Sequence, residues 1–478
     1  MKLKPFKKEK LTNKQKKILI ALSSLCFIFL FIAIYQSFAA YNIKHSERIV
    51  DAKVGSLHDI RVLAIYMDGE PQPNMTEFPK DKEFSHVRCY VEGEYRENIT
   101  GTWENDSLTI KPFTSKTDCN VYFLSHLLRD KIISDNGGES AIVARGTPDY
   151  SAATGNGLFK TNASIPGWTN TNQGLFSGTS ATHEGGDSYY YRGNIDNNHV
   201  RFAGFWWRII RIEGNGNIRL IYNGTLASNP TPPPQNGNTV IGQSRFNEND
   251  NHNRFIGFMF GSATGTYAEQ HANTTSSTIK TSLESWYINN LLTRDGGRWN
   301  NMIARNTIFC NDRNLVAGTG LGTTTTSYGS EARRVPFVSA RPSLQCINRT
   351  AAAGLSTVPT THDQFSAPNS ENRGNQRLTH PIGLITWDEA VIAGNFADEG
   401  RTSTVWISGR PSWSITPSTS FTPTIPNAVV FWRDIGNGSM GWVHASNASQ
   451  NTRPVISLNS DVRSVSGNGT RVNPYIIN

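Results

Sequence analysis

An uncharged apolar run near the N-terminus, at residues 18–35, constrains this chain more than any other feature: ILIALSSLCFIFLFIAIY. As a helix the run is about 27 Å long at 1.5 Å per residue, just enough for the hydrocarbon core of a bilayer. Residues 1–17 before it contain eight lysines and one acid, Glu9. Because basic residues stay on the cytoplasmic side, we expect residues 1–17 inside, one membrane helix within 18–39, and the rest of the chain outside.

The lysine block also explains the charge of the chain. Of the net charge of +8, eight lysines minus one acid contribute +7, which leaves +1 for everything after residue 17. A nucleic-acid-binding protein spreads basic residues over its folded surface, so we predict the membrane as a partner and no nucleic acid. Cleavage after Ala39, in the small-x-small sequence Ser37-Phe38-Ala39, would instead give a secreted protein. The apolar run exceeds the roughly 7–15 residues of signal peptides, which favours a retained anchor.

Four of the five cysteines follow the apolar run: Cys89, Cys119, Cys310 and Cys346. An even number in an exported chain suggests two disulfides, for which three pairings exist. Proximity in the sequence favours Cys89–Cys119 and Cys310–Cys346, and free buried thiols are the alternative. None of the spacings is CxxC, which argues against a zinc knuckle or a thioredoxin-like site.

Changes in composition divide the remaining chain into four parts, and the predicted fold class is α+β, mostly β. Residues 40–59 form a polar stalk, and residues 60–125 a small β-sandwich-like module in which Asp68-Gly69 signals a hairpin. Residues 126–186 start with a short helix, become rich in Gly, Asn and Thr, and are predicted to be a linker or insertion. Residues 187–478 form the large domain, with long polar loops.

The large domain contains the clearest strand pair of the chain. Residues 205–212 are followed by Asn215-Gly216, which predicts a type I′ turn before residues 217–222 return. Regular alternation would place Trp207 and Arg211 on one face of the sheet. Strand signals near both ends of this domain suggest that its first and last strands meet.

Two helices are predicted in the same domain. Apolar residues recur at helical spacing over residues 278–291. Residues 386–389, TWDE, form a T-x-x-E capping box for a short helix that ends at Gly394. Asp388 and Glu389 face about 100° apart on a helix, so we do not expect them to share a site. We therefore interpret them as residues that cap the helix and complement its dipole, not as a catalytic pair.

Six stretches of the large domain resemble exported bacterial proteins with a C-type-lectin-like domain. They are FAGFWWRIIRIEGNGNIRLIYNGT (202–225), SSTIKTSLESWYINNL (276–291), HPIGLITWDEAVIAG (380–394), WSITPS (413–418), RPVISL (453–458) and GNGTRVNPYII (467–477). That domain is distantly similar to the formylglycine-generating sulfatase-modifying fold. The module at 60–125 looks like the small disulfide-bearing β domain often placed before it. The resemblance implies an irregular β fold with two helices and long loops, and it implies no established chemistry.

These features favour a ligand-binding or adhesin-like module at the cell surface, which would contact a glycan or a protein on another surface. Large aromatic side chains dominate such contacts, and the candidate ligand-contact residues are Trp387, Trp406, Trp432 and Trp442. A structural cell-envelope protein without a small ligand is the first alternative.

The sequence contains no recognisable catalytic pattern, since HExxH, GxSxG and Walker motifs are missing, and no cofactor is predicted. An oxidase like the formylglycine-generating enzymes is the second alternative. It would require Cys310 and Cys346 as reactive thiols, but neither flanking stretch matches that enzyme's cysteine segment. Asn311 and Asp312 offer oxygen ligands that suit calcium, yet two residues do not make a metal site. The other acid–base candidates are predicted to be isolated and solvated: His183, Glu184, His362, Asp363 and His380.

The topology can be tested on intact cells. Protease added from outside is expected to remove everything after about residue 40, because the lysine block orients the single span. An immunoblot against a C-terminal epitope measures the loss, and a cytoplasmic protein that survives the treatment shows that the cells are sealed. Persistence of the large domain until lysis would contradict the predicted orientation.

Overall fold

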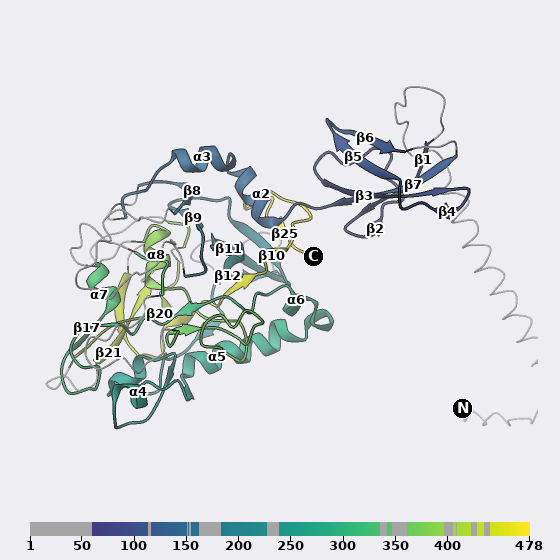
Figure 1. Ribbon diagram of the computed structural model, residues 1–478. Coiled ribbons are helices and arrows are strands. Elements are labelled where there is room, and N and C mark those ends of the chain that lie inside the picture. The colour runs from purple at the N-terminus through teal and green to yellow at the C-terminus, as the bar shows by residue number, and fades with distance from the viewer. Residues whose placement is uncertain are drawn as a thin grey trace, which may run out of the picture. The chain divides into compact units, whose positions relative to one another are not determined.

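The computed structural model describes residues 60–112, 116–150, 152, 154–161, 183–226, 239–334, 342–346, 361–395, 405–407, 409–421, 428–434 and 440–478 (Figure 1). The predicted membrane helix and stalk lie outside these residues. Within them, no helix is long and apolar enough to cross a membrane. The chain divides into two units, Met1–Ser125 and His126–Asn478. Over the described residues strands predominate over helices, which agrees with the predicted α+β, mostly β class.

The first unit is built on a five-stranded sheet in the order β2-β1-β7-β3-β4. Its strands are β1 (Ile60–Met67), β2 (Glu70–Pro71), β3 (Glu83–Val91), β4 (Glu94–Tyr95) and β7 (Thr117–Leu124), and β5 (Thr100–Glu104) pairs with β6 (Ser107–Lys111) in a separate hairpin. The predicted turn at Asp68-Gly69 is confirmed. Both residues have positive φ, and Met67 pairs with Glu70 across a two-residue loop.

Alternation along β7 creates the core of the first unit. Buried and half-buried residues alternate along the whole strand, so Cys119, Val121 and Phe123 share one apolar face. Trp103 of β5 packs edge-on against Phe123, with ring centroids 5.2 Å apart. Cys119 lies directly opposite Cys89 of β3, and the two form a disulfide. The hairpin and the disulfide thus close a small core on one side of the sheet.

The second unit contains two seven-stranded sheets. The first has the path β24-β12-β11-β10-β25 with β8 and β9 beside it, and comprises β8 (Gly157–Lys160), β9 (Tyr189–Arg192), β10 (His199–Phe202), β11 (Phe205–Ile212), β12 (Ile218–Thr225), β24 (Val455–Leu458) and β25 (Tyr475–Ile476). The second comprises β13 (Gly242–Gln243), β17 (Leu315–Ala317), β18 (Thr326–Tyr328), β20 (Ser412–Phe421), β21 (Ala428–Asp434), β22 (Met440–His444) and β23 (Asn451–Thr452). The last strand, β25, pairs in parallel with β10, an early strand of this unit, but β8 and β9 precede β10 in the chain, so the partner of the last strand is not the first one.

Short helices and ladders complete the second unit. The helices are α2 (Leu128–Asp135), α3 (Gly138–Ala144), α4 (Tyr267–Gln270), α5 (Thr278–Tyr287), α6 (Arg298–Asn301), α7 (Gly329–Arg334) and α8 (Trp387–Ile392), with 3-10 turns at Asn253–Ile256 and Arg294–Gly297. The two-stranded ladders are β14 (Met259–Phe260) with β15 (Thr275–Ser276), and β16 (Phe309–Cys310) with β19 (Gln364–Phe365). The predicted helix over 278–291 is confirmed, since a π-helical turn at Ile288–Leu292 continues α5 and its apolar stripe is buried.

The central β11–β12 hairpin differs from its prediction in two ways. Glu213 pairs with Asn217 through a backbone hydrogen bond, so the loop holds three residues, with only Gly216 at positive φ. That is a three-residue hairpin loop with glycine in the left-handed position, not the predicted type I′ turn. In addition, a β-bulge between Ile209 and Arg211 changes the register.

The bulge moves Arg211 to the other face of the sheet. Trp207 is opposite Tyr222, whereas Arg211 is opposite Arg219. Side chains alternate along β12, so Tyr222 and Arg219 lie on opposite faces, and their partners do the same. The predicted grouping of Trp207 with Arg211 is therefore wrong, because a bulge adds one residue to one strand and re-aims the side chains beyond it.

The described residues of the segment expected to be a linker or insertion contribute to the core and the sheet of the second unit. Helices α2 and α3 place Leu128, Ile132 and Ile142 in its main apolar core. Strand β8 pairs with β9, which in turn pairs with β11, so residues 157–160 extend the central sheet. The second unit thus starts at His126 and not at residue 187. The apolar residues of α2 and α3 pack against strands that are distant in the sequence, so only the tertiary structure shows these contacts.

The structure contains both disulfides expected from proximity, Cys89–Cys119 and Cys310–Cys346. Replacing Cys89 and Cys119 by serine in the full chain is expected to lower the free energy of unfolding by about 3 kcal/mol, because the unfolded chain regains loop entropy. Denaturant unfolding in a mild detergent measures the loss, with Cys26→Ser as the control that removes no bridge. Non-reducing peptide mapping that recovers a cross-unit pair would contradict the assignment.

Candidate functional site

Helix α8 lies at the centre of the candidate site and is buried over its whole length. The predicted capping box is confirmed: Thr386 Oγ1 accepts the Glu389 amide at 3.0 Å, and Glu389 Oε2 accepts the Thr386 amide at 3.1 Å. At the other end, Arg192 of β9 donates to the carbonyls of Val391 and Ile392 at 2.9 and 3.0 Å. Acidic residues at the N-terminus and a cation at the C-terminus both complement the helix dipole.

Two arginines face each other across the β11–β12 pair, and Glu389 lies between them. Arg211 and Arg219 are direct register partners, and like charges so placed repel each other. Glu389 Oε1 is 3.0 Å from Arg211 Nε and 2.6 Å from Arg219 Nε. Glu184 pairs with Arg211 at 2.8 Å and Glu213 with Arg219 at 3.2 Å. Three buried carboxylates thus surround two buried guanidinium groups.

A second ion group forms around Arg333 of α7. Its Nε and Nη2 donate to the two oxygens of Asp388 at 2.7 Å each. Nη2 also donates to Asp312 at 2.6 Å. The amide of Ser343 donates to Asp388 Oδ1 at 2.7 Å. Such bidentate, charge-assisted bonds are among the strongest polar contacts in proteins, so α7 and the segment 342–346 are held against α8.

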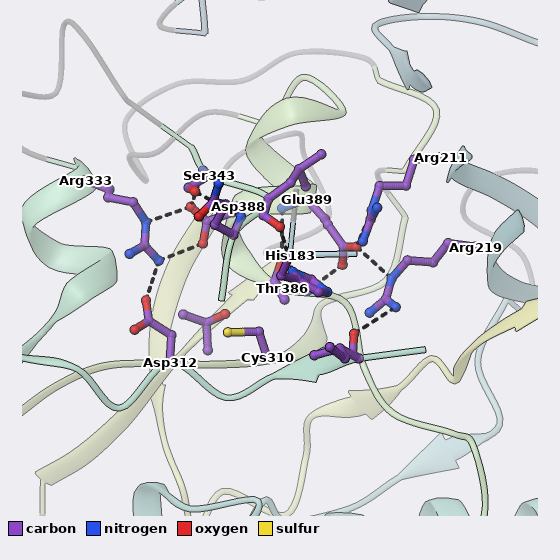
Figure 2. A pocket seen from close by; sticks show the side chains of 14 residues that line it. His183, Arg211, Arg219, Cys310, Asp312, Arg333, Ser343, Thr386, Asp388 and Glu389 are labelled. Carbon is purple, nitrogen blue, oxygen red and sulfur yellow. Dashed lines mark hydrogen bonds and ion pairs between the residues drawn. The ribbon is translucent and has the colours of Figure 1, made fainter. Parts of the chain in front are cut away.

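Both groups line one small pocket (Figure 2). Asp388 and Glu389 therefore share a site, contrary to the prediction from helix geometry, because arginines approach the first turn of α8 from both sides. The pocket leaves about 20 Å³ to the centre of a water-sized sphere, where about 10–15 Å³ is needed for one water. Its lining residues are His183, Arg211, Arg219, Ile308, Cys310, Asp312, Arg333, Ser343, Leu344, Gln345, Thr386, Asp388, Glu389 and Thr416.

Burial and charge act in opposite directions on the carboxyl groups. Burial raises the pKa of Glu389, but Arg219 and Arg211 outweigh it, and the pKa is lowered. Glu184 follows the same rule: its burial is outweighed by Arg211 and His183, and its pKa lies well below the usual value. For Asp388, burial outweighs Arg333 and the pKa is raised. Carboxyl groups with divergent pKa values can act as acid and base, but here both oxygens of Asp388 are already bonded to the protein.

The disulfide forms one wall of the pocket. Cys310 of β16 lines it directly, and its partner Cys346 is also buried. Leu344, two residues earlier, accepts a hydrogen bond from His183 Nδ1 at 2.7 Å. The segment 342–346 is thus attached by a covalent bond, by His183 and by Asp388. A cysteine, acidic groups and a histidine meet here although they are far apart in the sequence.

The four tryptophans predicted to contact a ligand lie in different environments. Trp387 and Trp406 are buried in the main core of the second unit, so their rings are closed to any ligand, and that expectation is wrong for them. Both indole rings fill the apolar core, which is the more common place for a large aromatic side chain. Trp442 of β22 is 48% exposed. Trp432 is the register partner of Trp442, and its side chain is outside the described part of the structure.

Three of the other acid–base candidates, His183, Glu184 and Asp363, are buried and paired, which corrects the expectation that they are isolated in solvent. His183 Nε2 lies 2.8 Å from Glu184 Oε1, and both side chains are buried. Asp363 accepts hydrogen bonds from the amide and the guanidinium of Arg313 at 2.8 and 2.9 Å. Sequence neighbours gave no sign of these partners, because the ion pairs join residues far apart in the chain.

The oxygen ligands considered for calcium are already engaged. Asn311 Oδ1 accepts the Phe258 amide at 2.8 Å, and its Nδ2 donates to the Ile415 carbonyl at 2.8 Å. Asp312 pairs with Arg333. Among the residues that the structure describes, no cluster of three or more His, Cys, Asp or Glu side chains could hold a metal ion.

The sequence did not single out Arg219, Glu213 or Arg333 as members of a site. One signal was present: charged residues inside the apolar strands at 205–212 and 218–225 are costly unless they are paired. The sequence could not say which acids pair with them. In comparisons with known proteins, no protein-family model, curated protein or solved structure matches this chain.

Removal of one buried cation tests the ion group around Arg333. Arg333→Met is expected to lower the free energy of unfolding by about 3–5 kcal/mol, because Asp388 and Asp312 lose their buried counter-charge. The matched control is Arg245→Met, which removes the exposed Arg245–Glu248 pair and should cost less than about 1 kcal/mol. Urea unfolding of the full chain in detergent measures both. Equal losses in the two variants would show that the buried group does not stabilise the fold.

Proposed function

We propose that this chain is a membrane-anchored extracellular surface protein whose second unit is a C-type-lectin-like, ligand-binding module and not a catalyst. The lysine block and the apolar run support the anchor, with cleavage after Ala39 and secretion as the alternative. The two disulfides support an oxidising location, because cytosolic thiols are kept reduced. The sequence resemblance and the mostly-β architecture support the lectin-like assignment.

The observation that carries the non-catalytic proposal is the state of the pocket. Each of its ionisable side chains already has a charged partner within the described structure. General acid–base catalysis requires a group that can exchange a proton with a substrate in contact with it. Space for about one water leaves no room for a sugar ring or a peptide side chain. The ionisable groups of the pocket therefore suit a structural role, in which they hold α7, α8 and the β11–β12 strands together.

The surface of the second unit supports the binding role. Trp442 lies on β22, which pairs with β21, and its indole contacts the ring of His444 with centroids 5.9 Å apart. His444 Nδ1 is 3.5 Å from Asp250 Oδ2, and Ser446 donates to the same oxygen at 2.8 Å. A large exposed aromatic beside hydrogen-bonding groups is a typical anchor for a ligand.

The oxidase alternative has one specific observation in its favour, the position of Cys310 beside His183 and Asp388. In the structure this cysteine is bonded to Cys346, so no thiolate is present to attack a substrate. The structural-envelope alternative predicts a folded surface protein with no saturable ligand.

Ligand binding can be measured with the full chain in mild detergent on a panel of immobilised neutral and acidic oligosaccharides. We expect saturable binding to at least one class, and Trp442→Ala should weaken that binding about tenfold, the equivalent of about 1.4 kcal/mol. Val472→Ala, a change at an exposed apolar residue just before β25 of the other sheet, should leave binding unchanged. A folded chain that binds none of the panel would favour the structural alternative. Turnover of a peptide cysteine that disappears in Cys310→Ser would favour the oxidase.

A further inference from the structure

The outer face of the first unit's sheet is unusually aromatic. Alternation in β1, β3 and β7 sends the apolar core to one face, and the other face carries Tyr66, Tyr122 and His86 in register across three strands. The rings of Tyr66 and Tyr122 stack with centroids 4.6 Å apart at 15°, and His86 stacks on Tyr122 at 4.4 Å and 3°. This ring spacing follows the distance between neighbouring strands, about 4.8 Å.

A second aromatic pair lies further along the same face. Tyr90 of β3 is the register partner of Tyr95 of β4, with centroids 5.9 Å apart and planes tilted by 58°. Tyr95 is 53% exposed. The ring of Tyr122 is stacked against both Tyr66 and His86, whereas about half of the Tyr95 side chain is open to a ligand.

Between these two aromatic groups the register places three smaller or charged residues side by side: Ala64, Asn120 and Arg88. Asn120 of β7 is the partner of Ala64 on one side and of Arg88 on the other. The Arg88 guanidinium lies 5.6 Å from the centroid of Tyr122, and within the described structure it makes no ion pair. Arg61, the other arginine on this face, is already paired with Asp118 at 2.8 Å. Among the described arginines on this face, Arg88 is thus the one that remains available to a carboxylate of a ligand.

The charges around Arg88 determine which acidic ligands this face can bind. The pKa of His86 is lowered by burial and then by Arg88, so the imidazole is neutral at neutral pH. Residues 60–125 contain 7 Lys and Arg against 11 Asp and Glu, a net charge of −4 (7 minus 11). A densely charged polyanion would be repelled by such a module, whereas a ligand with one carboxylate at Arg88 would gain a charge-assisted contact.

The size of the aromatic face favours a short linear ligand over a globular protein. Three steps between β1 and β4 span about 14 Å, and residues 61–66 span about 17 Å along the strand. That area is about one third of the roughly 800 Å² per partner that a stable protein interface buries. Extended peptides are usually captured at sheet edges through backbone hydrogen bonds, whereas this face offers only side chains: hydroxyl, amide, guanidinium and aromatic groups.

We infer that the outer face of the β1-β7-β3-β4 sheet is a glycan-binding site for an oligosaccharide in which neutral sugars alternate with carboxylated ones. Tyr95 stacks on a neutral sugar ring, Arg88 binds the carboxylate of its neighbour, and the hydroxyl of Tyr122 and the amide of Asn120 bond to sugar hydroxyls. This inference rests on the proposed function only in requiring that the first unit lies outside the cell. The inferred site on the first unit is separate from the binding site proposed around Trp442.

A matched pair of probes tests the assignment by calorimetry on the full chain in mild detergent. The probes are a hyaluronan hexasaccharide, which alternates neutral and uronic sugars, and the same oligosaccharide after chemical reduction of its carboxyl groups. Arg88→Ala is expected to weaken binding of the acidic form about tenfold, which corresponds to loss of one charge-assisted bond, and to leave the reduced form unaffected. Tyr95→Ala should weaken both forms about tenfold, and Tyr95→Phe should retain both.

The same calorimetric affinities provide the control and the outcomes that would contradict the inference. Arg245→Ala, at an exposed arginine of the second unit, should change neither affinity, and unchanged melting temperatures show that the variants fold. Failure of the folded chain to bind either probe would overturn the inference, as would equal losses in Arg88→Ala and Arg245→Ala. Tighter binding of a polyglutamate peptide would assign the face to an acidic peptide instead.

The two proposals fail separately. Binding that falls in Trp442→Ala but not in Arg88→Ala or Tyr95→Ala would place the glycan on the second unit, overturning this inference and leaving the proposed function intact. Failure of the proposed function is measured by protease accessibility and by the oligosaccharide panel with Trp442→Ala, neither of which involves Arg88 or Tyr95.

Discussion

The second unit depends on Glu389, which lies between two arginines that face each other across β11 and β12. Two guanidinium groups at neighbouring positions in a buried sheet repel each other and have lost their water. The Glu389 carboxylate, within 3.0 Å of both guanidinium groups, offsets this repulsion and the loss of hydration. Glu389 is in turn fixed by the capping box of α8, and α8 can only take its place when the sheet has formed. Sheet and helix therefore stabilise each other, and neither has a satisfactory buried environment alone.

Arg333 and the disulfide extend this dependence to distant segments. Arg333 connects α7 to α8 and to Asp312, and Asp388 holds the segment 342–346, which is also bonded to Cys310. Ionisable groups normally associated with catalysis are thus engaged in holding helices, loops and sheet together. For the ligand binding proposed at Trp442, a frame fixed in this way would lower the entropy cost of association.

The first unit achieves stability by other means, and this leaves one of its faces available. Its core is apolar, and the Cys89–Cys119 bridge joins two strands directly opposite each other. The core side chains of the sheet lie on one of its sides, and the hairpin and neighbouring loop residues such as Ile99 and Phe78 complete the core there. The aromatic and polar side chains on the other side contribute cross-strand contacts but are not needed to exclude water from the core. Side chains on such a face can therefore be substituted without loss of the fold.

The sequence by itself determined the features that depend on near neighbours. It predicted the Asp68-Gly69 turn, the T-x-x-E cap at residues 386–389, the helix over 278–291 and the pairing of cysteines close in the chain, because each follows from local geometry or loop length. It did not determine that residues 126–161 join the second unit, that a bulge turns Arg211 to the other face, or that Trp387 and Trp406 are buried. Nor could it select, among 46 basic and 38 acidic residues, the pairing of Arg211 with Glu389, 178 positions away. Only the tertiary structure decided these, because Coulomb attraction between distant residues depends on positions that the completed fold sets.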